Sequence, residues 1–140
     1  MSDAASPRDH PADHVPVVGI IGGGQLARMM IEASERAGVR CRVLAKPSDQ
    51  SAEQLGADVT LVDAIDAAAV DAFAATVDVL TFDFEPPDLS PYEALEARGF
   101  PVRPSTAALH FSDKAHQRVA FAAAGLPVPP FALVQTLDEC

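Results

Sequence analysis

Three consecutive glycines at positions 22–24 separate a strand-like run from a helix-like pattern, and they narrow the possible folds more than any other feature. The run before them, residues 17–21, is short, apolar and rich in β-branched side chains, as in a strand buried on both faces. After them, apolar residues recur at helical spacing over residues 26–37, and Gly38 can close that helix in the left-handed conformation. A buried strand, a tight turn and a helix in this order predict the first unit of a parallel sheet.

The alternation of strand and helix patterns continues along the chain. Apolar runs predict further strands over residues 41–44, 59–62 and 77–82, and a brief extended piece over residues 100–102. Helices are predicted over residues 67–75 and 91–97, and a long Ala-rich helix from a capping Ser105 to about Ala124; Asp66 is expected to cap the first of these. The fold class is therefore α/β, with an open parallel sheet and right-handed crossovers.

Charge and cysteine content exclude several classes of function. Twenty acidic residues against ten basic ones give a formal charge of −10, which disfavours binding to nucleic acid or anionic membranes but leaves a small anionic ligand possible. No apolar stretch reaches the ~18 residues that a membrane helix needs, and the N-terminus lacks the apolar segment of a signal peptide, so we expect a cytoplasmic protein. Cys41 and Cys140 cannot form a disulfide framework or a zinc site, and Cys41 is expected to be a buried apolar side chain.

The glycine segment is the first candidate site. Gly22, Gly24 and Ala27 match the three positions of the dinucleotide-binding fingerprint, in which a helix N-terminus faces an anion. A tight turn without a ligand is the alternative. The next predicted strand ends at residues 44–47 without the acidic residue that holds the ribose in NAD-binding proteins. Lys46 could meet a 2′-phosphate there, so NADP binding stays open, although a solvated loop charge explains Lys46 equally simply.

Two further segments are expected close to the glycines. Gln25 places an amide at the first helical turn, where it can hydrogen-bond a ligand. Strands of an open α/β sheet present ligands at their carboxyl ends, so Glu85, just after the fourth predicted strand, is expected near the glycine loop. Strand alternation places Asp83 on the same face as Glu85, and Phe82 and Phe84 on the other. Glu85 fits either a ligand-binding role or a carboxylate satisfied by the protein itself.

These segments together resemble a known family. Residues 22–29 and 81–85, with residues 101–105 and the pair Asp113 and Lys114, resemble the N-terminal domain of 5-(carboxyamino)imidazole ribonucleotide synthase, an ATP-grasp carboxylase of purine biosynthesis. The resemblance runs from about Val17 to Val134. It implies a Rossmann-like pre-ATP-grasp domain over residues 16–104, followed over residues 105–140 by a linking helix and the truncated start of an ATP-grasp domain.

The two ends of the chain complete this division. Residues 1–15 are polar and are expected to form a disordered tail; His10 and His14 lie four residues apart, but Pro11 interrupts any helix that would make them metal ligands. Residues 131–134 have the pattern of a strand, and residues 136–140 that of the first turn of another helix. A chain that stops after beginning new elements is expected to be a fragment of a longer protein.

The resemblance implies a reaction and its participants. Such enzymes use ATP and Mg²⁺ to join bicarbonate, through carboxyphosphate, to the amino group of 5-aminoimidazole ribonucleotide, and the full-length enzyme is a homodimer. By position, Gly24, Gln25 and Leu26 would lie beside the ribonucleotide with Glu85 nearby, and Lys114 would face ATP. The catalytic residues and magnesium ligands belong to the missing domains, so no catalytic or metal-binding residue is expected in this chain, and the chain alone is expected to be inactive.

The sequence departs from the family pattern at four positions and leaves other functions open. Ala27 replaces a glycine, Asp83 a glutamate, Pro86 an asparagine and Lys114 an arginine. The last change replaces a planar guanidinium, which can donate two parallel hydrogen bonds, with an ammonium group that acts as a point charge. A formate-using transformylase of the same pathway is disfavoured because it carries Glu where Gln25 stands. A stand-alone Rossmann-like module that binds a nucleotide without catalysis, or an NADP-binding domain, are the remaining alternatives.

Overall fold

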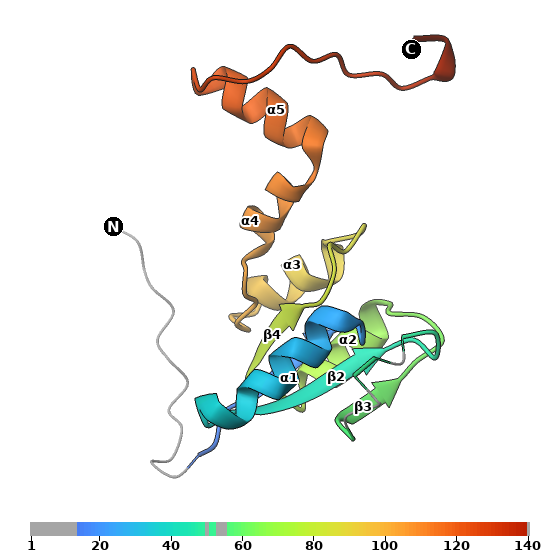
Figure 1. Cartoon of the computed structure of the whole chain (residues 1–140), viewed down its shortest axis with the longest axis vertical. Helices are drawn as coiled ribbons and strands as arrows, with labels where there is room; N and C mark the ends of the chain where they lie inside the picture. The colour runs from blue at the N-terminus through green and yellow to red at the C-terminus, as the bar shows by residue number, and fades with distance from the viewer. Residues whose placement is uncertain (1–13, 50, 53–55, 140) are drawn as a thin grey trace. The chain divides into compact units, whose positions relative to one another are not determined.

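The computed structural model describes residues 14–49, 51–52 and 56–139 (Figure 1). The chain divides into two compact units, the first ending at Thr106 and the second beginning at Ala107. The expectations for His10, for most of the predicted tail and for Cys140 lie outside the described residues. None of the described helices is both long and apolar enough to cross a membrane.

The first unit alternates strands and helices, as predicted. Its elements are β1 (Val17–Ile21), α1 (Gln25–Ala37), β2 (Arg40–Ala45), β3 (Asp58–Leu61), α2 (Ala67–Ala74), β4 (Val79–Phe82) and α3 (Ser90–Ala97) (Figure 1). The first strand is observed over the predicted residues, and the other predicted strands differ from the observed ones by one or two residues at their ends. Gly38 closes α1 at a φ of 67°, and the Asp66 carboxylate accepts a hydrogen bond from the Ala69 N–H at 2.9 Å to cap α2. Both predicted helix ends are thus confirmed.

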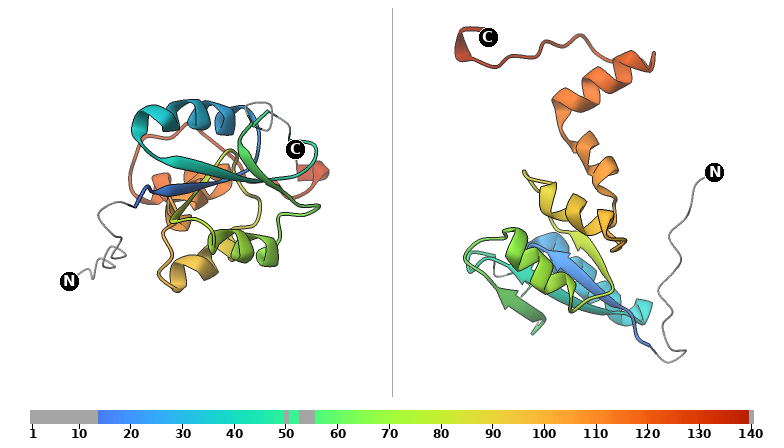
Figure 2. Two further views of the ribbon diagram at one scale, coloured as in Figure 1. Left: turned by 90° about the horizontal axis from the view of Figure 1, so that it is seen from below. Right: turned by 180° about the vertical axis from the view of Figure 1, so that it is seen from behind.

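The four strands form one parallel sheet in the order β3-β2-β1-β4. A further parallel bridge joins Leu80 of β4 to Val102, so the predicted extended piece at residues 100–102 adds to the edge beyond β4. The left view of Figure 2 shows α1 on one side of the strands and α2 and α3 on the other. The predicted open α/β sheet is confirmed.

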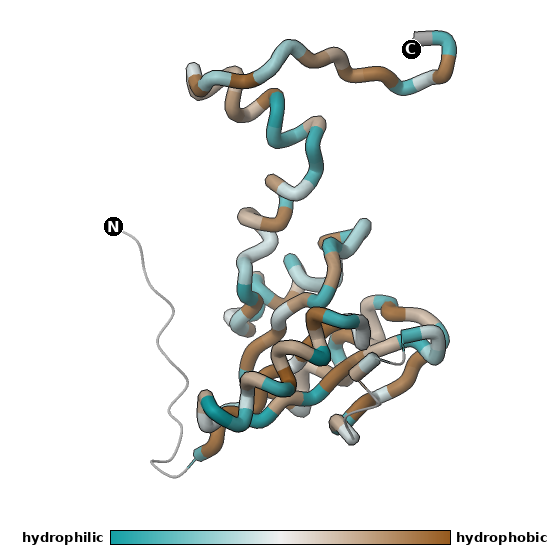
Figure 3. The backbone as a smooth tube through the Cα atoms, viewed as in Figure 1, coloured by the Kyte–Doolittle hydropathy of each residue, from teal (hydrophilic) through white to brown (hydrophobic). Residues whose placement is uncertain are grey.

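Both faces of the sheet are buried, because neighbouring residues of one strand enter different cores. Ile21 and Leu44 pack with α2 and α3 residues such as Phe73 and Leu95, whereas the adjacent Ile20 and Val43 pack on the α1 side with Ala27. Hydrophobic colour accordingly follows much of β2 in Figure 3. Continuous apolar strands are what a parallel sheet covered on both faces requires.

The start of the first unit is held by Asp78, the residue before β4. Its Oδ2 atom accepts the Val17 N–H at 2.8 Å and lies 2.8 Å from Nε2 of His14.

Cys41, expected to be buried, is only half-buried, so that prediction is wrong. Partial burial raises the pKa of the Cys41 thiol, and a hydrogen bond with Ser34 lowers it by less.

The single long helix predicted after Ser105 is wrong. The structure has α4 (Thr106–Leu109), a 3-10 turn (His110–Ser112) and α5 (Lys114–Ala123). Asp113 has an extended backbone, and its Oδ1 accepts the His116 N–H at 2.9 Å. Ser112 donates to the Leu109 carbonyl at 2.7 Å. Short polar side chains compete for backbone groups in this way, and they end one helix and begin the next.

The strand predicted at residues 131–134 is also wrong. In the described part of the second unit these residues form neither a strand nor a helix, and Phe131, Leu133 and Val134 are exposed. Leu137–Glu139 form a 3-10 turn where a helical turn was expected. An apolar run alone is not sufficient for a strand, because a strand is stable only beside a partner.

Tyr92 of α3 gives a test of the core that needs no substitution, because it is the only tyrosine in the sequence. Its side chain is 2% exposed and packs edge-on against Phe82 at 4.8 Å between ring centroids. Burial, with a smaller contribution from the charge of Asp88, raises the pKa of Tyr92 from 10.0 to about 12.

A titration followed by tyrosinate absorbance is expected to give a midpoint near 12 in the folded protein and near 10 in denaturant. Because the folded-state pKa is the higher one, burial of the neutral Tyr92 hydroxyl contributes to the free energy of unfolding. This contribution is complete below pH 10 and is lost as the pH rises towards 12. A midpoint near 10 without denaturant would contradict the packing of α3 on β4.

Candidate functional site

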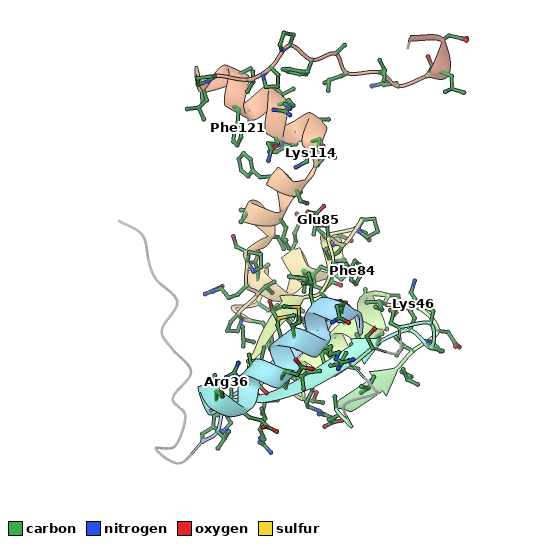
Figure 4. All side chains as sticks on the ribbon, in the orientation of Figure 1. Arg36, Lys46, Phe84, Glu85, Lys114 and Phe121 are labelled. Carbon is green, nitrogen blue, oxygen red and sulfur yellow. The ribbon has the colours of Figure 1, made fainter. Side chains whose placement is uncertain are left out.

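The carboxyl ends of β1 and β4 define the candidate site. The chain passes from β1 through β2 to β3 on one side of β1, and then returns to place β4 on the other side. Ligands of open α/β sheets bind at such a switch point. The loop at residues 22–24 leaves β1 there, and Asp83, Phe84 and Glu85 leave β4 beside it; Figure 4 labels Phe84 and Glu85.

Each glycine of the loop is required by a neighbouring group of the protein. Gly22 has a φ of +99°, and a Cβ atom there would lie 2.7 Å from the Phe84 ring. A Cβ at Gly23 would lie 2.7 Å from the Asp49 carbonyl oxygen. A Cβ at Gly24 would collide with the Asp83 carboxylate. The close approach that glycine permits is thus used by side chains and backbone of this chain.

Asp83 makes the most specific contacts at this edge. Its Oδ2 accepts the Gly24 N–H at 2.5 Å and its Oδ1 accepts the Ala27 N–H at 2.8 Å. Gly24 is the N-cap residue of α1 and has no side chain with which to cap the helix. Asp83, which follows β4, therefore supplies the cap from a distant part of the sequence. Sequence analysis placed Asp83 on the correct side of the strand but assigned it no contact.

Two other backbone N–H groups of the first turn of α1 have no acceptor among the described residues. The N–H groups of Gln25 and Leu26 are the first two of α1, and neither has a hydrogen-bond partner among the described residues. Both side chains are exposed, Leu26 to 56%. The start of the helix therefore presents two N–H groups and the amide of Gln25 to solvent or to a ligand.

Phe84 and Glu85, the two residues after Asp83, differ in their surroundings. The expectation that Phe84 points away from the loop is wrong, because its ring lies against Gly22. Strand alternation ends at Phe82, the last residue of β4, and no longer fixes the directions of later side chains. Glu85 is exposed, and its carboxylate has no hydrogen-bond partner within the described ranges.

A hollow of about 250 Å³ adjoins Phe84 at the same edge of the sheet. Lys46 after β2, Pro86 and the buried Tyr92 are among its lining residues. Lys46 makes no ion pair with a described residue. A larger hollow of about 480 Å³ lies at the opposite edge, beside Arg40 and Asp58 at the amino ends of β2 and β3. The carboxyl edge is the better candidate, since ligands of this fold bind there.

The predicted site residues fall into both units. Gly24, Gln25, Leu26 and Glu85 are brought to one edge of the first unit, whereas Lys114 is the exposed first residue of α5 in the second unit. Across residues 14–49, 51–52 and 56–139, no group of three or more His, Cys, Asp or Glu side chains could hold a metal ion. Magnesium is therefore not matched by the described residues.

Comparisons with known proteins agree with this fold. The family model of the ribonucleotide synthetase pre-ATP-grasp domain matches residues 15–113. Among curated proteins, the N5-carboxyaminoimidazole ribonucleotide synthase of Mycobacterium tuberculosis is 42% identical over 125 residues, which cover 89% of this chain and 29% of that protein. The corresponding protein of Corynebacterium ammoniagenes is 38% identical over 143 residues, covering 97% and 34%.

Solved structures give the same result. The N5-carboxyaminoimidazole ribonucleotide synthetase of Thermotoga maritima superposes with a TM-score of 0.74 at 31% identity and covers 89% of this chain and 35% of that one. The Aspergillus clavatus enzyme, solved in complex with ADP and 5-aminoimidazole ribonucleotide, superposes with a TM-score of 0.71 at 29% identity, covering 81% and 31%. The chain thus spans about a third of the length of the relatives it matches.

Proposed function

Because the chain belongs to the ribonucleotide synthetase pre-ATP-grasp domain family, we propose that it is the N-terminal domain of an enzyme that carboxylates 5-aminoimidazole ribonucleotide. The complete enzyme would consume ATP and bicarbonate and release 5-(carboxyamino)imidazole ribonucleotide, ADP and phosphate. The observation that carries this proposal is the 42% identity to a named synthase over 125 residues, which cover 89% of this chain. The activity is a property of the complete enzyme, and the chain itself contributes a binding surface.

That surface would hold the ribonucleotide. The open N–H groups of Gln25 and Leu26, next to Gly24, can donate to acceptor atoms of the substrate. The unpaired carboxylate of Glu85 can accept hydrogen bonds from a hydroxyl or amino group. Donors and an acceptor exposed at one edge suit a ligand that carries both kinds of group, as a ribonucleotide does.

ATP as a substrate and the homodimer are proposed from membership of the family alone. The exposed Lys114 carries a cation that would attract ATP phosphates, as a point charge rather than a planar fork. The described residues do not fit a magnesium site, so no step through that ion is assigned to this chain. A homodimer acting in the cytoplasm, and bicarbonate as the carbon source, complete the proposal.

The proposal is tested by substituting Glu85 in this chain. Glu85→Gln is expected to weaken the binding of 5-aminoimidazole ribonucleotide about tenfold or more, because a charged acceptor is replaced by a neutral amide oxygen and a second acceptor oxygen is lost. Isothermal titration calorimetry measures both affinities. The matched control is Glu35→Gln, which removes the same charge from an exposed position near the other end of α1 and is expected to leave the affinity unchanged.

Three results would count against the proposal. Equal affinities of the wild type and Glu85→Gln would remove Glu85 from the site. Tighter binding of NADPH than of the ribonucleotide would favour the dinucleotide-binding alternative and give Lys46 a role. Release of phosphate from ATP by this chain alone, above a heat-inactivated control, would show that the chain is more than a binding domain.

A further inference from the structure

The first turn of α1 carries its own anion. Of the four N–H groups of residues 24–27, the carboxylate of Asp83 accepts those of Gly24 and Ala27, at 2.5 and 2.8 Å. A helix N-terminus bears roughly half a positive charge, and a carboxylate held against it cancels most of the attraction for another anion. The loop therefore has the shape of an anion site without the corresponding charge.

The position of Asp83 conflicts with dinucleotide binding. In the dinucleotide fingerprint, the second glycine lets the pyrophosphate approach the loop backbone. Gly24 stands at that position here, and the atoms nearest to its missing side chain all belong to the Asp83 carboxylate. A pyrophosphate would meet a fixed negative charge and would find two of the N–H groups already occupied.

The other two glycines reinforce this arrangement. The Phe84 ring packs on Gly22, and the Asp49 carbonyl oxygen lies close to Gly23. All three glycines are thus approached by groups of this chain itself. The N–H groups of Gln25 and Leu26 remain open beside Asp83.

We propose that Asp83 sets the charge selectivity of this loop: it acts as an internal anion that excludes pyrophosphate and leaves the Gln25 and Leu26 N–H groups to a ligand of lower charge. This inference rests on the proposed function in taking the loop as part of the ligand-binding edge. Asp83 is a positioning residue, because it acts on the ligand through the loop.

The test uses inorganic pyrophosphate and the backbone amide signals of residues 23–27 in NMR spectra. The wild type is expected to show no saturable shift, whereas Asp83→Ala is expected to bind pyrophosphate at least about tenfold more tightly, since the freed N–H groups form charge-assisted hydrogen bonds. Asp83→Glu keeps the charge and is expected to behave like the wild type. The control Asp88→Ala removes an exposed carboxylate that accepts the Ser90 N–H at 2.9 Å and does not cap α1, and it is expected to bind no pyrophosphate.

Each outcome decides the proposal. Binding by the wild type, equal affinities of the wild type and Asp83→Ala, or binding by Asp83→Glu would each overturn it. If Asp83→Ala loses the amide protection of the first turn of α1, the neutral isostere Asp83→Asn replaces it with the same expectation. The readout involves no ribonucleotide, so the proposal can fail while ribonucleotide binding is retained, and the reverse is also possible.

Discussion

Replacing Leu80 by alanine is expected to lower the free energy of unfolding by about 2–5 kcal/mol, the range found for large apolar side chains removed from a core. Leu80 is fully buried in β4, and its Cδ2 atom fills the space left by the missing side chain of Gly19. The backbone bonds of Leu80 to Pro101 and Arg103, at 3.0 and 2.8 Å, do not depend on the side chain. The loss would therefore report the packing of β4 against β1, and chemical denaturation followed by circular dichroism measures it.

The matched control is Leu61→Ala in the same unit. Leu61 is the last residue of β3 and is 47% exposed, so the same atoms are removed with less than about 1 kcal/mol of expected loss. Equal losses at Leu61 and Leu80 would mean that the Leu80 side chain is not buried between β4 and β1. The sheet order, and with it the position of the candidate site between β1 and β4, would then be wrong.

The parts of the fold that sequence analysis predicted correctly are those set by short-range chemistry. Asp66 could be predicted to cap α2 because the residues that it bonds lie within one helical turn. Gly38 could be predicted to end α1 because only a residue that tolerates a positive φ fits there. The parallel sheet then followed from the order of strands and helices, without knowledge of any long-range contact.

The errors arose where two local signals competed or where a partner was needed. Ser105 and Asp113 are both of residue types that cap helices, and the sequence between them gave no sign that a new helix would begin after Asp113. Residues 131–134 have a strand pattern, yet pattern alone cannot supply the neighbour to which a strand must bond.

The site was predictable in position but not in detail. Ligands of open α/β sheets bind at the carboxyl ends of the strands, and this rule correctly predicted that the glycine loop and the end of β4 lie close together. The contacts of Asp83 with Gly24 and Ala27 join residues 59 and 56 positions apart, a separation at which no local pattern operates. One signal was available: Gly24 cannot cap its own helix, so an acid after the neighbouring strand was a candidate for the cap.

The second large effect is expected from Gly24→Ala, which should cost about 1–3 kcal/mol of stability through overpacking. Gly24 has a φ of −81°, which alanine adopts without strain, so the cost comes from collision with the Asp83 carboxylate. In an Asp83→Ala background the colliding atoms are absent, and the same substitution should then cost under about 1 kcal/mol, the preference for glycine over alanine at an N-cap.

The double-mutant cycle measures this difference directly by chemical denaturation of the four proteins. A coupling energy of about 1 kcal/mol or more is expected for residues in contact, whereas independent positions add to within about 0.5 kcal/mol. Additive losses would mean that Asp83 does not require glycine at position 24. The close approach at Gly24 would then be available to a ligand, the phosphate-binding interpretation of the loop would return, and the internal-anion inference would lose its main structural support. Strong coupling would instead show that the glycine is present for the carboxylate, so a fingerprint that matches dinucleotide-binding proteins in sequence would serve a different purpose here.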